Sequence, residues 1–323
     1  SPNAILALAD IDDPIQLSAD GTTVAVSFQA DVVANKHETW ANVSLAGTWT
    51  GDQTVGGYTP AVDDCDNSTV LVSGNIVAVA WEDNRSGSDD AYVSSADVSG
   101  GSVVFGGEAL VSATGAGYPR LSGSGDYMAV ASSSGTYPNT AAGSISRDGG
   151  VTWGAPFDIS DNTGFDVDYA EMAFNSLYGN FVVAWLSDDL GANNLYAGGA
   201  RSQTISPAGT FSTGNLVHFD ASGFGASEDG KHFGVLLSGG AGSYLLPFGD
   251  NREGGLSPGR YLNYSLANIP GILSGSLASG SGSTVDLVMP NLPPGTTINF
   301  AGITFAPGPS LFSLTDINSL ETL

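Results

Sequence analysis

The stretch TVLVSGNIVAVAW, residues 69–81, decides the fold because it joins two apolar runs through a tight turn. Apolar or alternating runs of this kind, bounded by turn residues, are typical of β-strands. Similar stretches recur along the chain, so the segment is one copy of a repeat. The other copies are IQLSADGTTVAVSF (15–28), PRLSGSGDYMAVAS (119–132), EMAFNSLYGNFVVAW (171–185) and, more weakly, FGASEDGKHFGVLL (224–237) and LASGSGSTVDLVM (277–289).

The repeat has a nearly constant length. The third copy contains four strand-like runs, YPRLSG, YMAVAS, GSISRD and VTWGAPFDIS. Four short strands repeated every 40 to 50 residues, roughly, are typical of the blades of a β-propeller. We therefore expect an all-β, six-bladed β-propeller of four-stranded antiparallel blades. The intervals between equivalent positions are 53, 51, 53, 52 and 52 residues, counted from Val24, Val77, Met128, Phe181, Phe233 and Val285.

Six units of this length nearly exhaust the 323 residues, so we expect a single propeller domain over residues 1–323. The apolar run AILALAD (4–10) precedes the first unit, and we interpret residues 1–13 as a strand that closes the ring with the last blade. Closure removes exposed sheet edges, which otherwise pair with other chains. A seven-bladed ring would require the ends of the chain to be divided differently.

The charge of the chain limits its partners. It carries 33 acidic and 8 basic residues, a formal charge of −25. Such a surface repels nucleic-acid phosphates and anionic lipids, so we expect neither nucleic acid nor a membrane as partner. The apolar runs are also shorter than the roughly 18 residues of a membrane helix. The chain starts at Ser1, which we interpret as a removed signal peptide, and we expect an extracellular, cell-surface or periplasmic protein.

Residues 146–153, SRDGGVTW, lie at the junction of the third and fourth strands of the third unit. An Asp in a tight turn accepts hydrogen bonds from following N–H groups, glycine permits positive φ, and tryptophan buries a large ring. A structural turn recurs in every blade, whereas a catalytic site occurs once, so we interpret the motif as structural. Degenerate copies at the same position are SLAGTW (44–49), SADVSGGSVVF (95–105) and SQTISPAGTF (202–211).

The motif resembles the Asp-box of the BNR, sialidase-like β-propellers, and WEDNRSGSDDAY (81–92) resembles repeats of secreted bacterial propellers. The resemblance implies that the motif lies on the face away from an active site. Sialidases are similar to one another in a three-arginine clamp that begins in a Phe/Tyr-Arg-Ile-Pro stretch. Here that place reads DDPIQL, and only Arg85 and Arg120 fall on the expected binding face. The matching residues are Ser146, Asp148, Gly150, Thr152 and Trp153.

The loops of the opposite face carry clusters of carboxylates, including VDDCDN (62–67), EDNRSGSDD (82–90) and DISDNTGFDVD (158–168). Oxygen ligands suit Ca²⁺, which makes it the candidate cofactor, although no cluster has EF-hand spacing. Solvated loop carboxylates are the alternative. The three histidines show no metal-binding spacing. The candidate ligands are Asp83, Asp89 and Asp90, and a second set of Asp161, Asp166 and Asp168.

We expect a non-catalytic binding module that holds a protein or a glycan through its acidic loop face. One alternative is a sialidase-like glycoside hydrolase, since paired carboxylates can cleave glycosidic bonds. Its catalytic residues would be Arg120, Asp168, Tyr169 and Glu171, for which salt pairing along the channel is the other interpretation. A third alternative is a structural subunit of an extracellular assembly. Propellers host binding, scaffolding and hydrolysis alike, so the fold does not choose among them.

Overall fold

The computed structural model divides into two compact units. Unit 1 runs from Ser1 to Ala200 apart from Leu177–Gly179, and unit 2 comprises those three residues with Arg201–Leu323. In the part of the chain that the structure describes, no helix is long and apolar enough to cross a membrane. The described residues are 11–33, 36–56, 64–112, 115, 117–135, 139–160, 167–175, 180–187, 194–201, 203–212, 214–224, 228–242, 256–259, 262–263, 266, 274–276, 283–288, 292–306, 310–315 and 318–321.

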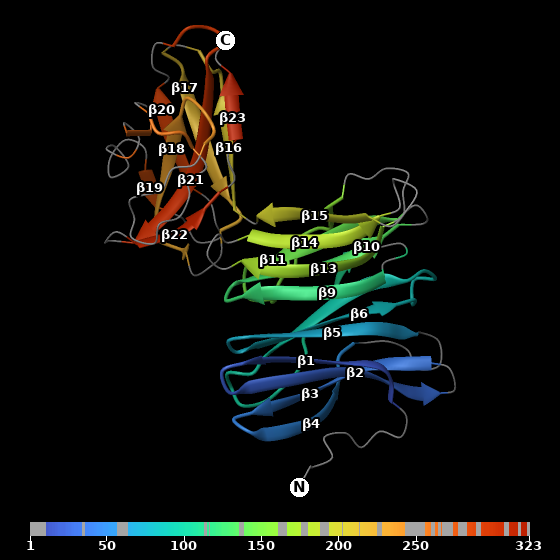
Figure 1. Ribbon diagram of the computed structural model, residues 1–323. Coiled ribbons are helices and arrows are strands. Elements are labelled where there is room, and N and C mark those ends of the chain that lie inside the picture. Colours follow the sequence, from blue (N-terminus) through green and yellow to red (C-terminus); the bar gives the residue numbers. More distant parts are fainter. Residues whose placement is uncertain are drawn as a thin grey trace. The chain divides into compact units, whose positions relative to one another are not determined.

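The described residues of unit 1 form four antiparallel sheets, each built from strands that are consecutive in the chain (Figure 1). The first sheet contains β1 (Ile11–Asp20), β2 (Thr23–Val33), β3 (Lys36–Leu45) and β4 (Thr48–Thr54). The second contains β5 (Cys65–Ser73), β6 (Ile76–Asp83), β7 (Asp90–Asp97) and β8 (Ala109–Ser112). The third contains β9 (Gly117–Ser124), β10 (Tyr127–Ser134), β11 (Thr140–Ser146) and β12 (Phe157–Asp158). The fourth contains β13 (Val167–Asn175), β14 (Asn180–Ser187) and β15 (Asn194–Arg201).

The repeat is visible in the turns that join the first two strands of the first, second and third sheets. Gly21, Gly74 and Gly125 occupy the same position of the repeat, and their φ angles are 58°, 58° and 61°. This left-handed conformation favours glycine because it has no Cβ. The same residue type at the same interval therefore sets the register of three successive hairpins, as the sequence repeat predicts.

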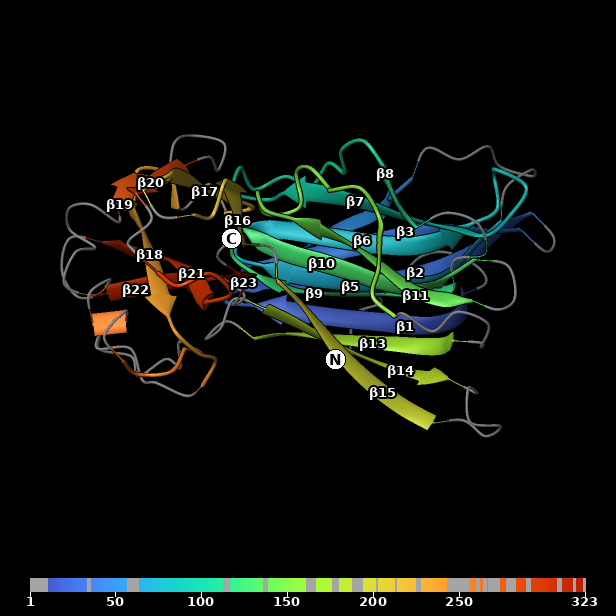
Figure 2. The same ribbon diagram turned by 90° about the horizontal axis from the view of Figure 1, so that it is seen from above.

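Hydrogen bonds at the repeat interval also join successive sheets. β1 contacts β5, β5 contacts β9 and β9 contacts β13, and Figure 2 shows β1, β5 and β9 adjacent from above. At two equivalent junctions, a turn glycine N–H donates to a polar side chain of the preceding sheet. The bonds between sheets are Val72 N to Ser18 Oγ (2.9 Å), Gly74 N to Asp20 Oδ2 (2.7 Å), Gly125 N to Ser73 Oγ (2.8 Å) and Phe174 N to Ser122 Oγ (2.8 Å). The 52-residue period is thus the spacing from one sheet to the next.

Unit 2 does not continue this plan, so the expected fifth and sixth blades are wrong. One sheet contains β16 (Thr204–Gly209), β17 (Leu216–Ser222) and β20 (Ser283–Val288). The other contains β18 (His232–Ser238), β19 (Ser274–Ser276), β21 (Thr297–Ala306), β22 (Ser310–Leu314) and β23 (Asn318–Glu321). Neighbouring strands of a blade are consecutive, whereas β17 pairs with β20 and β18 pairs with β21.

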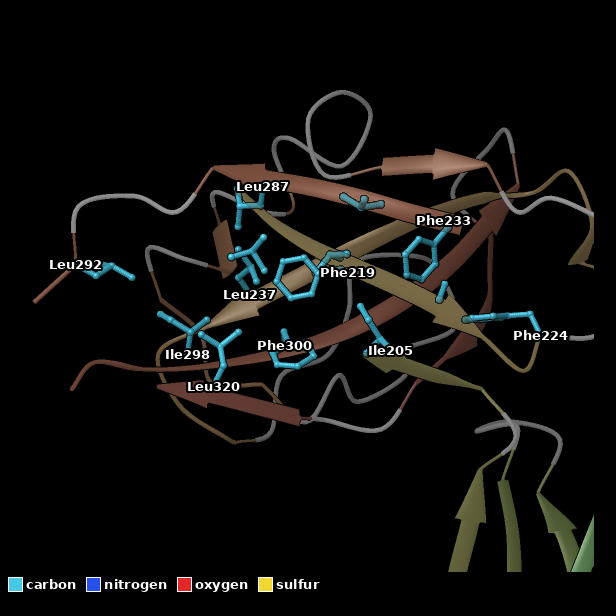
Figure 3. Packing of buried hydrophobic residues seen from close by; sticks show 14 residues of the cluster. Ile205, Phe219, Phe224, Phe233, Leu237, Leu287, Leu292, Ile298, Phe300 and Leu320 are labelled. Atoms are coloured by element: carbon cyan, nitrogen blue, oxygen red, sulfur yellow. The ribbon is translucent and has the colours of Figure 1, made fainter. Parts of the chain in front are cut away.

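The two sheets of unit 2 share one apolar core (Figure 3). Phe219 from β17 meets Phe300 from β21 edge to face, with ring centroids 5.2 Å apart. Phe233 from β18 is fully buried in the same core. Side chains from two facing sheets that fill one core make this unit a β-sandwich.

The prediction that residues 1–13 form a ring-closing strand is wrong for the last residues of this range. Residues 1–10 lie outside the described residues. Ile11 and Asp12 belong to β1, where they pair with Ala30 and Gln29 of β2. These two residues therefore belong to the first sheet and not to a last blade.

Candidate functional site

The turn at residues 146–153, here called the Asp-box turn, is held by its own side chains. Asp148 Oδ1 accepts from the N–H of Thr152 at 2.9 Å, and Oδ2 accepts from Thr152 Oγ1 at 2.6 Å. Ser146 Oγ donates to Asp148 Oδ1 at 2.9 Å and accepts from the N–H of Gly150 at 2.7 Å. Trp153 donates from Nε1 to the Gly150 carbonyl at 3.2 Å and packs on the core between the second and third sheets.

Other sheets have the same backbone contact at this position. The N–H of Gly149 donates to the carbonyl of Asp126 in the adjacent hairpin turn at 2.9 Å. Val98 to Asn75 (2.8 Å) and Ala46 to Thr22 (3.1 Å) are the equivalent bonds of the second and first sheets. The Asp-box turn therefore lies at the end of the sheets where the first two strands join. A recurring backbone bond is consistent with a structural role.

The opposite ends of the strands form a polar region, here called the loop rim, which comprises residues 31–33, 36–37, 64–67, 82–90, 117–120 and 167–171. Hydrogen bonds and ion pairs link these segments across all four sheets of unit 1. The N–H of Asp64 donates to Asn84 Oδ1 at 2.9 Å, and the N–H of Asn84 donates back to the Asp64 carbonyl at 3.2 Å. These two bonds fix the start of β5 against the end of β6.

His37 lies among three carboxylates of the loop rim. Its Nδ1 is 3.0 Å from Asp64 Oδ1 and 3.4 Å from Asp66 Oδ1. Its Nε2 is 3.3 Å from Asp31 Oδ1, and the His37 N–H donates to Asp64 Oδ1 at 3.0 Å. Lys36 Nζ lies 3.8 Å from Asp64 Oδ2. The cluster brings the end of β2 and the start of β3 to the start of β5.

Glu82 links the second sheet to the third. Its carboxylate accepts from Asn67 Nδ2 at 2.9 Å and from the N–H of Tyr118. Burial raises the pKa of Glu82, and the two hydrogen bonds oppose the increase. Asn67 and Tyr118 both have a φ of 51°, a costly conformation for residues other than glycine. Glu82 thus holds two strained backbone positions together.

Arg85 is enclosed by two carboxylates and a ring. Its guanidinium donates to Asp83, with Nε to Oδ2 at 2.8 Å, and to Glu108, and its Cζ lies 4.5 Å from the centroid of Tyr92. Asp83 is fully buried. Burial raises the pKa of its carboxyl group, but the hydrogen bonds and the charge of Arg85 lower that pKa by a larger amount, so the net shift is downward. Cys65, also fully buried, donates to Asp83 Oδ2 at 3.4 Å, and burial raises the pKa of its thiol.

The four residues of the catalytic alternative lie on neighbouring sheets. Arg120 Nε donates to Glu171 Oε1 at 2.9 Å, which joins β9 to β13. The Glu171 side chain is 68% exposed. Asp168 and Tyr169 belong to β13, but their side chains lie outside the described residues. The structure thus forms one of the salt pairs that the sequence suggested.

The structure does not bring the candidate calcium ligands Asp83, Asp89 and Asp90 together into one group of metal ligands. Asp83 is occupied by Arg85, Asp89 is exposed, and Asp90 is buried and accepts from Ser88 Oγ at 3.4 Å. Asp161 and Asp166, and the side chain of Asp168, lie outside the described residues. Within the described part of the chain, the group of donors close enough to share an ion is His37, Asp64 and Asp66.

Sequence reasoning missed this group because His37 and Asp64 are 27 residues apart. The carboxylates of VDDCDN (62–67) were correctly assigned to the connection between the first and second repeats, but the histidine that faces them lies in another loop. The remaining histidines are in unit 2. His218 Nδ1 lies 2.6 Å from Asp286 Oδ1, and the His232 ring stacks on Phe305 with centroids 5.4 Å apart.

Comparison with known proteins gives only distant similarities. No family model and no curated protein match the sequence. A solved structure with some similarity is the catalytic domain of a GH62 α-L-arabinofuranosidase from Coprinopsis cinerea, at 10% identity and a TM-score of 0.30, over 59% of this chain and 90% of that one. A sialidase from Trypanosoma rangeli is 11% identical with a TM-score of 0.25, over 70% of this chain and 35% of that one. Similarity at this level assigns neither a fold nor an activity.

Proposed function

We propose that this chain is a non-catalytic binding protein whose interaction face is the loop rim of unit 1. The observation that carries the proposal is that both arginines of the rim are engaged by carboxylates. Arg85 is held between Asp83 and Glu108, and Arg120 is paired with Glu171. The guanidinium groups that would hold an anionic substrate are therefore already occupied.

The charge of the rim favours a cationic ligand. Asp31, Asp64 and Asp66 gather around His37, Lys36 pairs with Asp64 of this group, and further carboxylates follow along the rim. Complementary charge on a partner raises its association rate and suppresses binding of wrong partners. We propose a protein segment rich in lysine or arginine as the partner class.

A hydrolase would need a carboxyl group that faces its substrate. Glu82 is the carboxyl group of the rim whose pKa is raised, as a general acid requires. However, it is only 9% exposed, and its two oxygens accept from Asn67 and from the backbone of Tyr118. These contacts favour a structural role for Glu82.

Binding can be tested with a decalysine peptide as the probe. The double variant Asp89→Asn with Glu171→Gln removes two exposed charges from the rim. The control, Asp220→Asn with Asp286→Asn, removes two exposed charges from unit 2 and gives the same net charge. At about 0.5 kcal/mol for each charge, we expect the rim variant to weaken binding roughly five-fold more than the control. Equal weakening by both variants would refute the proposed face.

Catalysis is tested separately with a panel of chromogenic glycosides. We expect no turnover by the wild-type protein. Turnover that is lost in Glu171→Gln or Glu82→Gln would establish the hydrolase alternative in place of our proposal. Circular dichroism of each variant controls for loss of folding.

A further inference from the structure

Two carboxylates converge on one ring nitrogen of His37. Nδ1 lies 3.0 Å from Asp64 Oδ1 and 3.4 Å from Asp66 Oδ1. A ring nitrogen carries at most one proton, which is directed along one line. A single N–H therefore cannot serve both carboxylates well, whereas a metal ion placed among the three atoms can.

The separations match those of ligands that share a small metal ion. With bonds of about 2.1 Å, neighbouring ligands lie about 3.0 Å apart at right angles and about 3.4 Å apart at the tetrahedral angle. These are the two distances measured from Nδ1. One donor atom from each of His37, Asp64 and Asp66 lies within 4.8 Å of the other two.

The other side of the ring provides an independent observation. Asp31 Oδ1 is a buried atom that accepts no hydrogen bond, and it lies 3.3 Å from His37 Nε2. When Nδ1 is a metal ligand, the proton of a neutral imidazole is on Nε2, 3.3 Å from Asp31 Oδ1, and a rotation of the ring that aligned this N–H would give the Asp31 oxygen its hydrogen bond. Metal-binding histidines commonly donate this second N–H to a carboxylate, which fixes the ring and strengthens the ligand.

Charge and donor type narrow the choice of metal. Three carboxylates and the Lys36 ammonium leave two negative charges around a neutral imidazole, which one divalent cation would balance. Calcium prefers oxygen ligands alone, whereas imidazole with carboxylates suits zinc and its neighbours. The Asp66 side chain is 51% exposed, so the open side of the cluster faces water that can complete the coordination.

We propose that His37, Asp64 and Asp66 form a site for a divalent transition-metal ion of the zinc type, with Asp31 as the residue that positions the imidazole. The ion would connect β3 of the first sheet to β5 of the second. This site does not depend on whether the loop rim binds a partner.

The test is a titration of the chelator-treated chain with Zn²⁺, monitored by calorimetry, and with Co²⁺, monitored by visible absorption. We expect one saturable Zn²⁺ site per chain and a Co²⁺ absorption band. His37→Gln and Asp66→Asn should weaken binding at least ten-fold, and Asp31→Asn should weaken it roughly 10- to 100-fold. Lys36→Met should strengthen binding, because it removes a competing cation.

The matched control is His218→Gln, which alters a histidine–carboxylate pair in unit 2 and should leave Zn²⁺ binding unchanged. The unfolding temperature of each metal-free variant shows whether it is folded. If the wild-type protein does not bind Zn²⁺ saturably, or if His37→Gln retains full affinity, the proposal is wrong. Preferential Ca²⁺ binding that survives His37→Gln would likewise overturn it. The rim variant Asp89→Asn with Glu171→Gln should still bind Zn²⁺, which separates this proposal from the binding function.

Discussion

Replacing Asp148 by asparagine tests whether the Asp-box turn stabilises unit 1. The carboxylate accepts hydrogen bonds from the N–H and Oγ1 of Thr152, from Ser146 Oγ and from the backbone N–H of Val151. Asparagine keeps one acceptor oxygen but places an N–H₂ group at the other, so at least the bond from Thr152 Oγ1 is lost. Hydrogen bonds to a charged group contribute about 1.5–3 kcal/mol when buried. Because this turn is half-exposed, we expect a loss of about 1–2 kcal/mol.

The effect should depend on pH. Burial raises the pKa of Asp148, but the hydrogen bonds from Thr152 and Ser146 lower it by more, so the folded pKa lies below the unfolded value. A carboxyl group with a lowered folded pKa contributes stability that is present above its unfolded pKa of about 3.9 and is lost as the pH falls through the folded value. The difference between wild type and Asp148→Asn should therefore be constant near pH 7 and should shrink below about pH 4.

Urea unfolding followed by tryptophan fluorescence measures both quantities. The matched control is Asp97→Asn, because Asp97 occupies the equivalent position of the second sheet but is fully exposed and accepts only from Ser99. We expect a smaller loss for this variant. Equal losses for the two variants, or a loss from Asp148→Asn that does not change between pH 7 and pH 3, would refute the reasoning.

Three further predictions concern packing and burial in unit 1. Gly123→Ala should destabilise the protein by about 1–3 kcal/mol, because a Cβ there would lie 2.4 Å from a carbonyl oxygen of β10; Gly100→Ala, which has open space, should be neutral by the same thermal melt. Arg85→Met should lower the free energy of unfolding by about 3–5 kcal/mol, because it leaves the fully buried Asp83 carboxylate without its cation; a loss of under a tenth of that free energy in urea unfolding would contradict the ion-pair account. The Cys65 thiol should resist an aromatic disulfide reagent at pH 8 until urea unfolds the chain, because burial raises its pKa; rapid reaction of the folded protein would show that the thiol is accessible.

The sequence repeat predicted unit 1 well because its information is local. Each hairpin joins adjacent strands, and a glycine at one fixed position, as at Gly74 and Gly125, sets the turn. In unit 2 the same apolar runs occur, but the partner of each strand is distant in the chain. Phe233 and Val285 fit the period, yet β18 pairs with β21 and β20 pairs with β17. Strand alternation indicates a half-buried strand and does not identify its neighbour.

The same distinction applies to the candidate sites. The hydrogen bonds of the Asp148 carboxylate come from within eight consecutive residues, so residue spacing was enough to predict that this carboxylate stabilises the turn. The cluster around His37 joins two loops that the repeat brings together, and the spacing of histidines and carboxylates along the chain did not reveal it. Asp83 was predicted as a calcium ligand, but in the structure its buried carboxylate is bound by the nearby Arg85.

The hydrogen bonds that join successive sheets have a consequence for how unit 1 can change over evolution. Since the Gly74 bond to Asp20 and the Gly125 bond to Ser73 use the same repeat position, every internal sheet presents the donor that the preceding sheet needs. In such arrays stability is approximately a sum of individual repeats and nearest-neighbour interfaces. A duplication or deletion of whole sheets would therefore preserve the junctions, whereas the loss of part of a sheet would leave a donor or an acceptor without its partner. Unit 1 can thus gain or lose whole sheets while the hydrogen bonds between the remaining sheets stay the same.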